Sequence, residues 1–140
     1  MKKTIYSILA LTAVLIIACN NPKKVVVENP YVGAWEQISY KYVSPDTTYE
    51  ITQYDVPKVK LLTIKHYAFG QQSGENTITG GGGEYMYVDG TFTTYPKYHS
   101  TSAAVGKSLR WKSTLNGDLW TISMDTLNST RTETWKRIPE

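Results

Sequence analysis

Apolar and polar residues alternate one by one through most of the chain from Tyr31 to Glu140. A period of two places successive side chains on opposite faces of an extended strand, and it is typical of a half-buried sheet. β-forming residues predominate in this region, and no stretch of it shows a convincing helical period. We therefore expect an all-β domain whose length suits a single core.

Turn signals divide this region into short strands. Asp89-Gly90 lies between GEYMYV and TFTTYPKY, and Asn116-Gly117 lies between KSLRWKSTL and DLWTISM. Both dipeptides favour type I′ hairpins, because their residues tolerate positive φ. The four segments that flank these two turns are predicted strands. Four more strands are predicted at VGAWEQISYKY, KVKLLTI, YAFGQQ and RTETWKRI, which gives about eight antiparallel strands. An up-and-down barrel is expected, because closure removes exposed sheet edges, and a β-sandwich is the alternative.

Four consecutive glycines, Gly80 to Gly83, precede the strand GEYMYV. A phosphate-binding loop requires a Lys and then a Ser or Thr after its glycines, followed by a helix. Here Glu84 and a strand follow instead. We interpret the glycine run as a bulge, a barrel corner or a close approach of another backbone.

The first residues of the chain predict export. Lys2 and Lys3 precede an uncharged run from Ile5 to Ala18, which ends at Cys19. A membrane-spanning helix needs about 20 apolar residues, so this shorter run predicts a signal peptide over residues 1–18. Cys19 is the single cysteine of the chain, which excludes a disulfide within it.

The run Ile16-Ile17-Ala18-Cys19 resembles the lipobox of bacterial lipoproteins. The resemblance implies that Cys19 becomes the first mature residue and carries the acyl chains, palmitate among them, that attach the protein to the membrane. Residues 19–30, with their prolines and lysines, are expected to form a flexible tether. The resemblance further implies an outer-membrane lipoprotein facing the periplasm, with surface exposure or simple secretion as alternatives.

Charge and motif content exclude several functions. Removing Lys2 and Lys3 lowers the net charge from +3 to about +1, and no basic stripe remains for nucleic acid or for electrostatic membrane binding. His66, expected in a turn, and His99, expected near a barrel mouth, lack the spacing of metal ligands. Without a serine elbow or a reactive thiol, we expect no catalytic residues, metal or cofactor.

The two ends of the predicted domain resemble those of the lipocalin family. VGAW contains the Gly-x-Trp motif that opens the first lipocalin strand, and TWKRI supplies a basic residue late in the last strand. The resemblance implies that Gly33 and Trp35 lie at the closed end of a barrel and that Arg137, or else Lys136, covers Trp35. KLLTIKHYAF and GGGGEYMYVDGTFTTY further resemble the lipocalin-like domain of secreted and lipidated bacterial proteins, which would span residues 31–140.

The aromatic content suggests a ligand pocket. The chain has eleven Tyr and four Trp, many of them on predicted strands. We expect a monomeric barrel that binds a small apolar or amphipathic molecule and contacts the membrane only through its anchor. The alternative is a non-catalytic interaction module of the cell envelope with a solid core. The ligand contacts are predicted to come from inward-facing residues of neighbouring strands, namely Tyr85, Tyr87, Phe92, Tyr98, Trp111 and Trp120.

Overall fold

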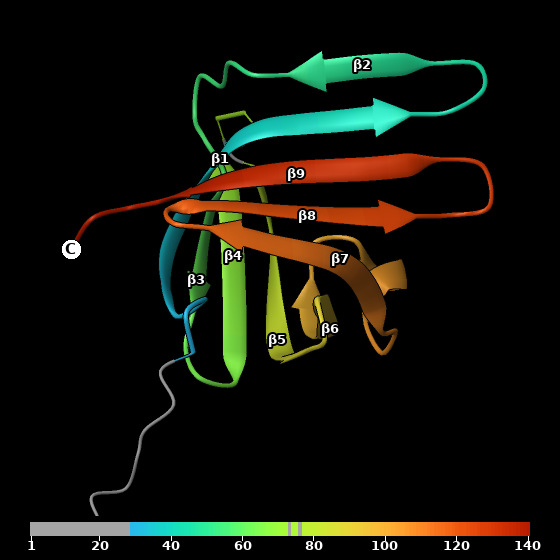
Figure 1. The fold of residues 1–140 in the computed structure, drawn as a ribbon. Helices are drawn as coiled ribbons and strands as arrows, with labels where there is room; N and C mark the ends of the chain where they lie inside the picture. The colour runs from blue at the N-terminus through green and yellow to red at the C-terminus, as the bar shows by residue number, and fades with distance from the viewer. Residues whose placement is uncertain (1–28, 73, 76) are drawn as a thin grey trace, which may run out of the picture.

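The computed structural model describes residues 29–72, 74, 75 and 77–140. The predicted signal peptide, the Cys19 anchor and the tether up to residue 28 lie outside these residues. The described chain forms one antiparallel sheet and a short 3₁₀ helix, η2 (Ser102–Ala104) (Figure 1). Its strands are β1 (Gly33–Val43), β2 (Thr48–Ile51), β3 (Val59–Leu62), β4 (His66–Gln72), β5 (Ile78–Val88), β6 (Thr91–His99), β7 (Leu109–Asn116), β8 (Leu119–Asp125) and β9 (Thr130–Arg137).

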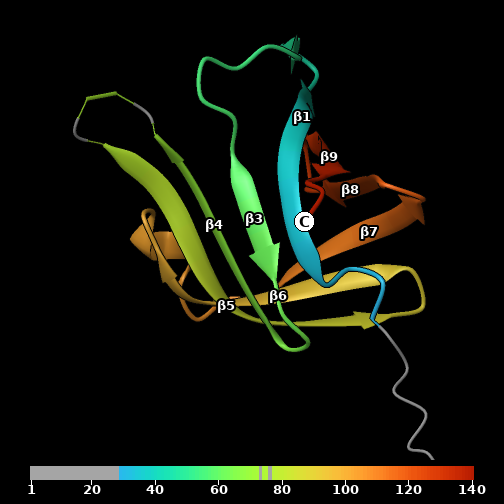
Figure 2. The same cartoon turned by 90° about the vertical axis from the view of Figure 1, so that its left-hand side faces the viewer.

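The sheet closes into a barrel because its first and last long strands pair. β1 pairs with β3 through Gly33–Glu36 and with β9 through Trp35–Val43. Between β3 and β9 every strand pairs with the next one along the chain, so eight strands form an up-and-down barrel. The predicted fold class is therefore confirmed. The sheet curls round on itself in the view of Figure 2.

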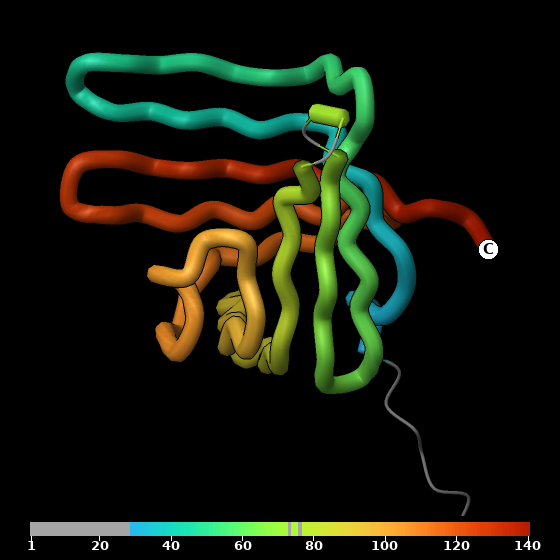
Figure 3. The backbone as a smooth tube through the Cα atoms, turned by 180° about the vertical axis from the view of Figure 1, so that it is seen from behind, coloured from blue at the N-terminus to red at the C-terminus, as the bar shows by residue number. Residues whose placement is uncertain are grey.

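The strand that the sequence did not predict is β2, which lies outside the ring. It pairs only with the second half of β1, from Tyr40 to Val43, and all four of its residues are exposed. Figures 1 and 3 show the β1–β2 and β8–β9 hairpins projecting together beyond the barrel. A strand with both faces in solvent lacks the alternating pattern on which the prediction depended.

Both predicted hairpins are present, and one differs from the prediction in its turn. Asp89 and Gly90 connect β5 to β6 with φ values of 46° and 75°, the positive pair that a type I′ turn needs. In the second hairpin Asn116 belongs to β7 and pairs with Leu119, so Gly117 and Asp118 form the loop. Gly117 has a φ of 57° and Asp118 has a negative φ. Glycine at the first central position is typical of type II′ rather than the predicted type I′.

Aromatic side chains fill one end of the barrel. Trp35, Trp120, Trp135 and Phe92 are completely buried there. The Trp120 ring lies at the centre of this cluster, with its centroid 5.4 Å from that of Trp35, 5.0 Å from that of Phe92 and 6.3 Å from that of Trp135. This end of the barrel is therefore a solid core.

The glycine run lies inside β5, opposite a bulge in β6, and a bulge was one of the roles predicted for it. The pairing of β5 with β6 shifts between Gly82 and Gly83, which leaves one extra residue on β6. A Cβ atom on Gly83 would overlap the Tyr95 carbonyl oxygen and lie 2.8 Å from the Lys97 amide nitrogen. The glycines allow two backbones to approach closely, and no helix follows them.

The bulge also corrects the prediction for Tyr98. A shift of one residue turns the following side chains to the opposite face of a strand. After the bulge, Tyr98 lies over Gly82 on the outside of the barrel and is 58% exposed. His99 takes the inward position, and its ring packs 5.5 Å from that of Phe69. Tyr98 is therefore excluded from the barrel interior.

Candidate functional site

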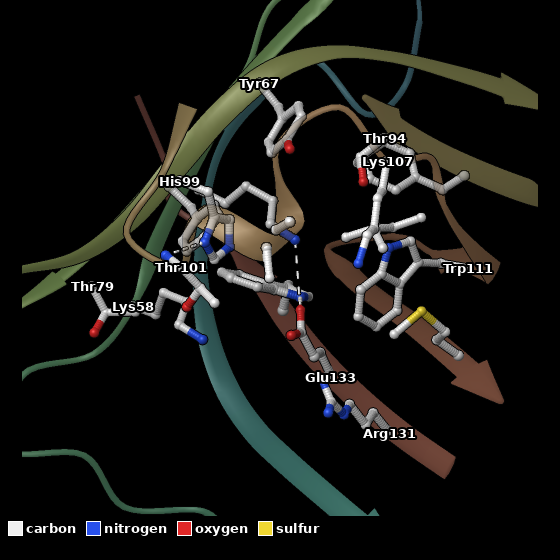
Figure 4. A pocket seen from close by; sticks show the side chains of 18 residues that line it. Lys58, Tyr67, Thr79, Thr94, His99, Thr101, Lys107, Trp111, Arg131 and Glu133 are labelled. Carbon is white, nitrogen blue, oxygen red and sulfur yellow. Dashed lines mark hydrogen bonds and ion pairs between the residues drawn. The ribbon is translucent and has the colours of Figure 1, made fainter. Parts of the chain in front are cut away.

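The other half of the barrel contains a cavity of about 540 Å³, which Trp135 and Phe92 of the aromatic cluster border. Antiparallel strands β3 to β9 supply its walls, and Figure 4 shows Tyr67, Trp111, Glu133 and Lys58 on different sides of the space. Its apolar and aromatic lining consists of Tyr67, Phe69, Phe92, Leu109, Trp111, Met124 and Trp135, with Ala103 and Ala104 of η2. The cavity volume lies within the range of sites for small organic ligands.

Two of the six predicted ligand contacts, Phe92 and Trp111, line this cavity. Phe92 is fully buried in its wall, whereas Trp111 is partly accessible. They lie opposite each other in the β6–β7 pairing, as expected for inward-facing residues of neighbouring strands.

The other four predicted contacts lie elsewhere. Trp120 is buried beneath the cavity, and its indole nitrogen donates a hydrogen bond to Ser113 Oγ at 2.9 Å. Tyr85 is a core residue whose hydroxyl donates to the Thr63 carbonyl oxygen at 2.6 Å. Tyr87 is 40% exposed and packs on Tyr31, with ring centroids 4.6 Å apart. Tyr98 is on the outside of the barrel, as described above.

The charged residues of the cavity wall were not predicted from the sequence. Lys58, Lys60, Lys107, Arg131 and Glu133 all line it. Only aromatic residues were predicted as ligand contacts, and burial of an unpaired charge is costly. The signal that could have found two of them is the alternation along β9, where Arg131 and Glu133 share a face with Trp135.

Lys60 and Glu133 form a buried ion pair at the floor of the cavity. The Lys60 Nζ atom is 3.6 Å from Glu133 Oε2, and the two side chains are 8% and 13% exposed. The ammonium group also lies 4.0 Å from the centroid of the Trp135 ring and 4.9 Å from that of Trp120. Glu133 is held in turn by the indole N–H of Trp135, which donates to Oε2 at 3.1 Å.

Burial lowers the pKa of Lys60 to about 8, and repulsion from Lys58 acts in the same direction. The attraction and hydrogen bonding of Glu133 oppose this shift without cancelling it. The ammonium group of Lys60 therefore lies among aromatic rings, and Glu133 stabilises its charge only in part.

The two histidines differ in position. His66 is exposed at the start of β4, next to the turn in which it was predicted. His99 lines the cavity at the end of β6, and its Nδ1 atom accepts a hydrogen bond from the Thr101 amide at 2.8 Å. Within residues 29–72, 74, 75 and 77–140, no three His, Cys, Asp or Glu side chains are grouped as a metal site would require.

At the opposite end of the barrel, Arg137 covers Trp35. The Arg137 guanidinium carbon lies 4.2 Å from the centroid of the Trp35 ring, so the contact expected between them is present. Arg137 also donates hydrogen bonds to the carbonyl oxygens of Val32 at 2.9 Å and Pro30 at 2.6 Å, and its Nε is 3.3 Å from Asp118. The alternative residue, Lys136, is exposed.

Gly33 allows this arrangement. Its φ of 133° is unfavourable for residues with a Cβ atom, and a Cβ there would lie 2.9 Å from the Arg137 guanidinium.

Asn29 and Pro30, which the sequence assigned to the tether, also contact the barrel. The Asn29 side-chain amide donates to the Tyr85 hydroxyl at 2.8 Å, and Pro30 accepts from Arg137 as described above.

The described part of the chain contains no helix with the length and apolar character needed to cross a membrane. No protein-family model, curated protein or solved structure matches the sequence or the fold.

Proposed function

We propose that this protein is a lipid-anchored, lipocalin-like lipoprotein of the outer membrane whose barrel binds one small amphipathic molecule. The observation that carries the binding role is the cavity of about 540 Å³ with its aromatic wall. Aromatic faces offer apolar contact area, and a few polar groups among them can orient a ligand. The same cavity disfavours the alternative of an interaction module with a solid core. The proposed role is binding, without catalysis.

The lipocalin-like assignment is supported by the arrangement of Gly33, Trp35 and Arg137 at one end of an eight-stranded up-and-down barrel. The anchor is supported by the run Ile16-Ile17-Ala18-Cys19, which resembles a lipobox. A Cys19→Ser variant is expected to lose labelling by a clickable fatty acid and to leave the membrane fraction. Equal labelling of the variant and the wild type would contradict the anchor.

Trp111 provides a test of binding because it is the partly accessible tryptophan of the cavity wall. Native mass spectrometry of the protein from its own host should reveal a co-purified small molecule. Adding that molecule back to the emptied protein should shift the tryptophan emission and raise the melting temperature with ligand concentration. A Trp111→Phe variant should retain the thermal shift and lose most of the emission change.

A matched pair of variants locates the binding site. Leu109→Trp adds bulk inside the cavity and should abolish the thermal shift, whereas Leu119→Trp adds the same bulk at an exposed position of β8 and should retain it. If both variants retain the thermal shift, the ligand binds outside the barrel. Absence of a co-purified molecule, with no thermal shift across lipids, haem, bile acids and flavonoids, would contradict the binding role.

A further inference from the structure

The charges around the cavity are unbalanced. Four cationic side chains line it, and Glu133 is the single carboxylate in the lining. The chain as a whole carries only +3, and +1 without Lys2 and Lys3. Residues 29–140 contain eleven Lys and Arg and eleven Asp and Glu, so the excess of cations at this cavity is local within a domain of no net formal charge.

The Lys60–Glu133 pair accounts for one cation and the only carboxylate. These two groups lie deep against Trp135, and their charges compensate each other. The excess charge belongs to Lys58, Lys107 and Arg131. Among the residues that the structure describes, none of these three takes part in an ion pair.

The strand directions place the three remaining cations at the same end of the barrel. Lys58 directly precedes β3, Lys107 lies between η2 and β7, and Arg131 is the second residue of β9. β3, β7 and β9 run in the same direction, because each is separated from the next by an even number of antiparallel steps. The cations therefore lie at the open rim, away from the Trp35–Arg137 end, with the aromatic wall below them.

We propose that the ligand is an amphipathic anion, whose carboxylate, sulfate or sulfonate group binds at the rim formed by Lys58, Lys107 and Arg131. Its apolar body then lies between Trp111, Phe92 and their neighbours. This inference rests on the proposed binding function and specifies the chemical class of its ligand. Partly exposed ion pairs each contribute modestly, so the three together predict roughly tenfold tighter binding of an anion than of a neutral molecule of the same shape.

Two fluorescent probes with the same aromatic body provide the test. Anilinonaphthalene sulfonate is anionic, and phenylnaphthylamine lacks the sulfonate. With the full protein at low ionic strength, we expect the anionic probe to bind roughly tenfold more tightly. Added salt should reduce this difference, because the rim charges are accessible to counterions.

Charge-matched variants distinguish the rim from the surface in general. Lys58→Gln/Lys107→Gln/Arg131→Gln should weaken binding of the anionic probe to the level of the neutral one. Lys41→Gln/Lys97→Gln/Lys136→Gln removes the same charge from exposed positions and should leave both affinities unchanged. Circular dichroism verifies that both variants are folded.

If the neutral probe binds and the anionic probe binds no more tightly, the anion subsite is excluded and the binding function stands. Equal effects of the two triple variants would likewise exclude the subsite. If neither probe binds to the folded protein, both the subsite and the proposed function are overturned.

Discussion

Lys60 is the residue with the most unusual environment in this structure. Its ammonium group lies among Trp120, Trp135 and Glu133 and is almost completely buried. Breaking a buried ion pair leaves an uncompensated charge, whereas replacing both partners by apolar groups is often neutral or stabilising. Burial of the Lys60 charge therefore costs stability, which the contacts with Glu133 and the two indole rings offset.

This environment predicts that stability rises between pH 8 and pH 10. The pKa of Lys60 is about 8 in the folded protein, whereas the ordinary pKa of a solvated lysine is 10.5, so the unfolded chain binds more protons in this interval. Stability increases with pH wherever the unfolded state binds more protons. Above pH 10 the buried tyrosines act in the opposite direction, since burial raises the pKa of Tyr31 to about 12 and also raises those of Tyr67 and Tyr85.

Urea unfolding at pH 7, 8, 9 and 10 measures this effect. The Lys60→Met/Glu133→Leu variant has no titrating pair and should lose the increase between pH 8 and pH 10. If the stability of the wild type stays constant or falls over the same interval, the pKa of Lys60 is not lowered as described.

Strand β5 shows how a local irregularity decides which residues form the site. Its glycines and the bulge opposite them turn Tyr98 outward and His99 inward. The bulge was one of the predicted roles of the glycine run. Its consequence for β6 was not predicted, because the extra residue lies on the partner strand and depends on backbone contacts between the two.

Substitution of Gly83 tests this account of β5. Gly83→Ala places a methyl group against the Tyr95 carbonyl oxygen, and because backbone cannot rotate away, we expect a loss of about 3 kcal/mol in unfolding free energy. Gly70→Ala on β4 is the matched control, since nothing lies within 4 Å of its Cβ position. That variant should change stability by less than about 1 kcal/mol. Chemical denaturation measures both, and similar losses in the two variants would contradict the close approach at Gly83.

The sequence predicted the elements better than it predicted the site. The Asp89-Gly90 turn and the alternation along β7 and β8 depend on local rules, and the structure confirms both. The cavity depends on which inward positions carry side chains too short or too polar to fill the barrel, and on the pairing of Lys60 with Glu133 from distant strands. Such long-range compensation has no local sequence signal.

At the scale of the whole molecule, the two halves of the barrel have different roles. The end that contains Trp35 and Arg137 is filled by packed rings, and the other end contains the cavity. Arg137 connects the last strand to the residues just before β1 through Pro30 and Val32, and to the β7–β8 turn through Asp118. One side chain thus joins three parts of the chain that are distant in sequence.

Loss of Arg137 should therefore weaken the whole barrel. Arg137→Ala removes the contact with Trp35, worth about 0.5–2 kcal/mol, and the hydrogen bonds of a charged donor, each worth about 1.5–3 kcal/mol. We expect a loss of about 3 kcal/mol in urea unfolding. Arg137→Lys should be intermediate, because an ammonium group cannot reproduce the planar, multiply donating geometry.

Lys136→Ala is the control, because Lys136 is exposed and its loss should cost less than about 0.5 kcal/mol. Ligand affinity should be unchanged in all three folded variants, since this end of the barrel lies away from the cavity. Equal stability of Arg137→Ala and Lys136→Ala would contradict the role given to Arg137.

The packed tryptophans of the closed end also give the folded molecule an optical property. Trp35 and Trp135 flank Trp120 with ring centroids 5.4 and 6.3 Å away, and the interplanar angles are 61° and 35°. Indole transitions at such separations, inclined to one another and fixed in place, couple as excitons and absorb left and right circularly polarised light to different extents. The folded barrel should therefore have a bisignate far-ultraviolet couplet that a random chain of the same composition lacks. Because the coupling depends steeply on ring spacing, this couplet reports how the three indole rings are packed.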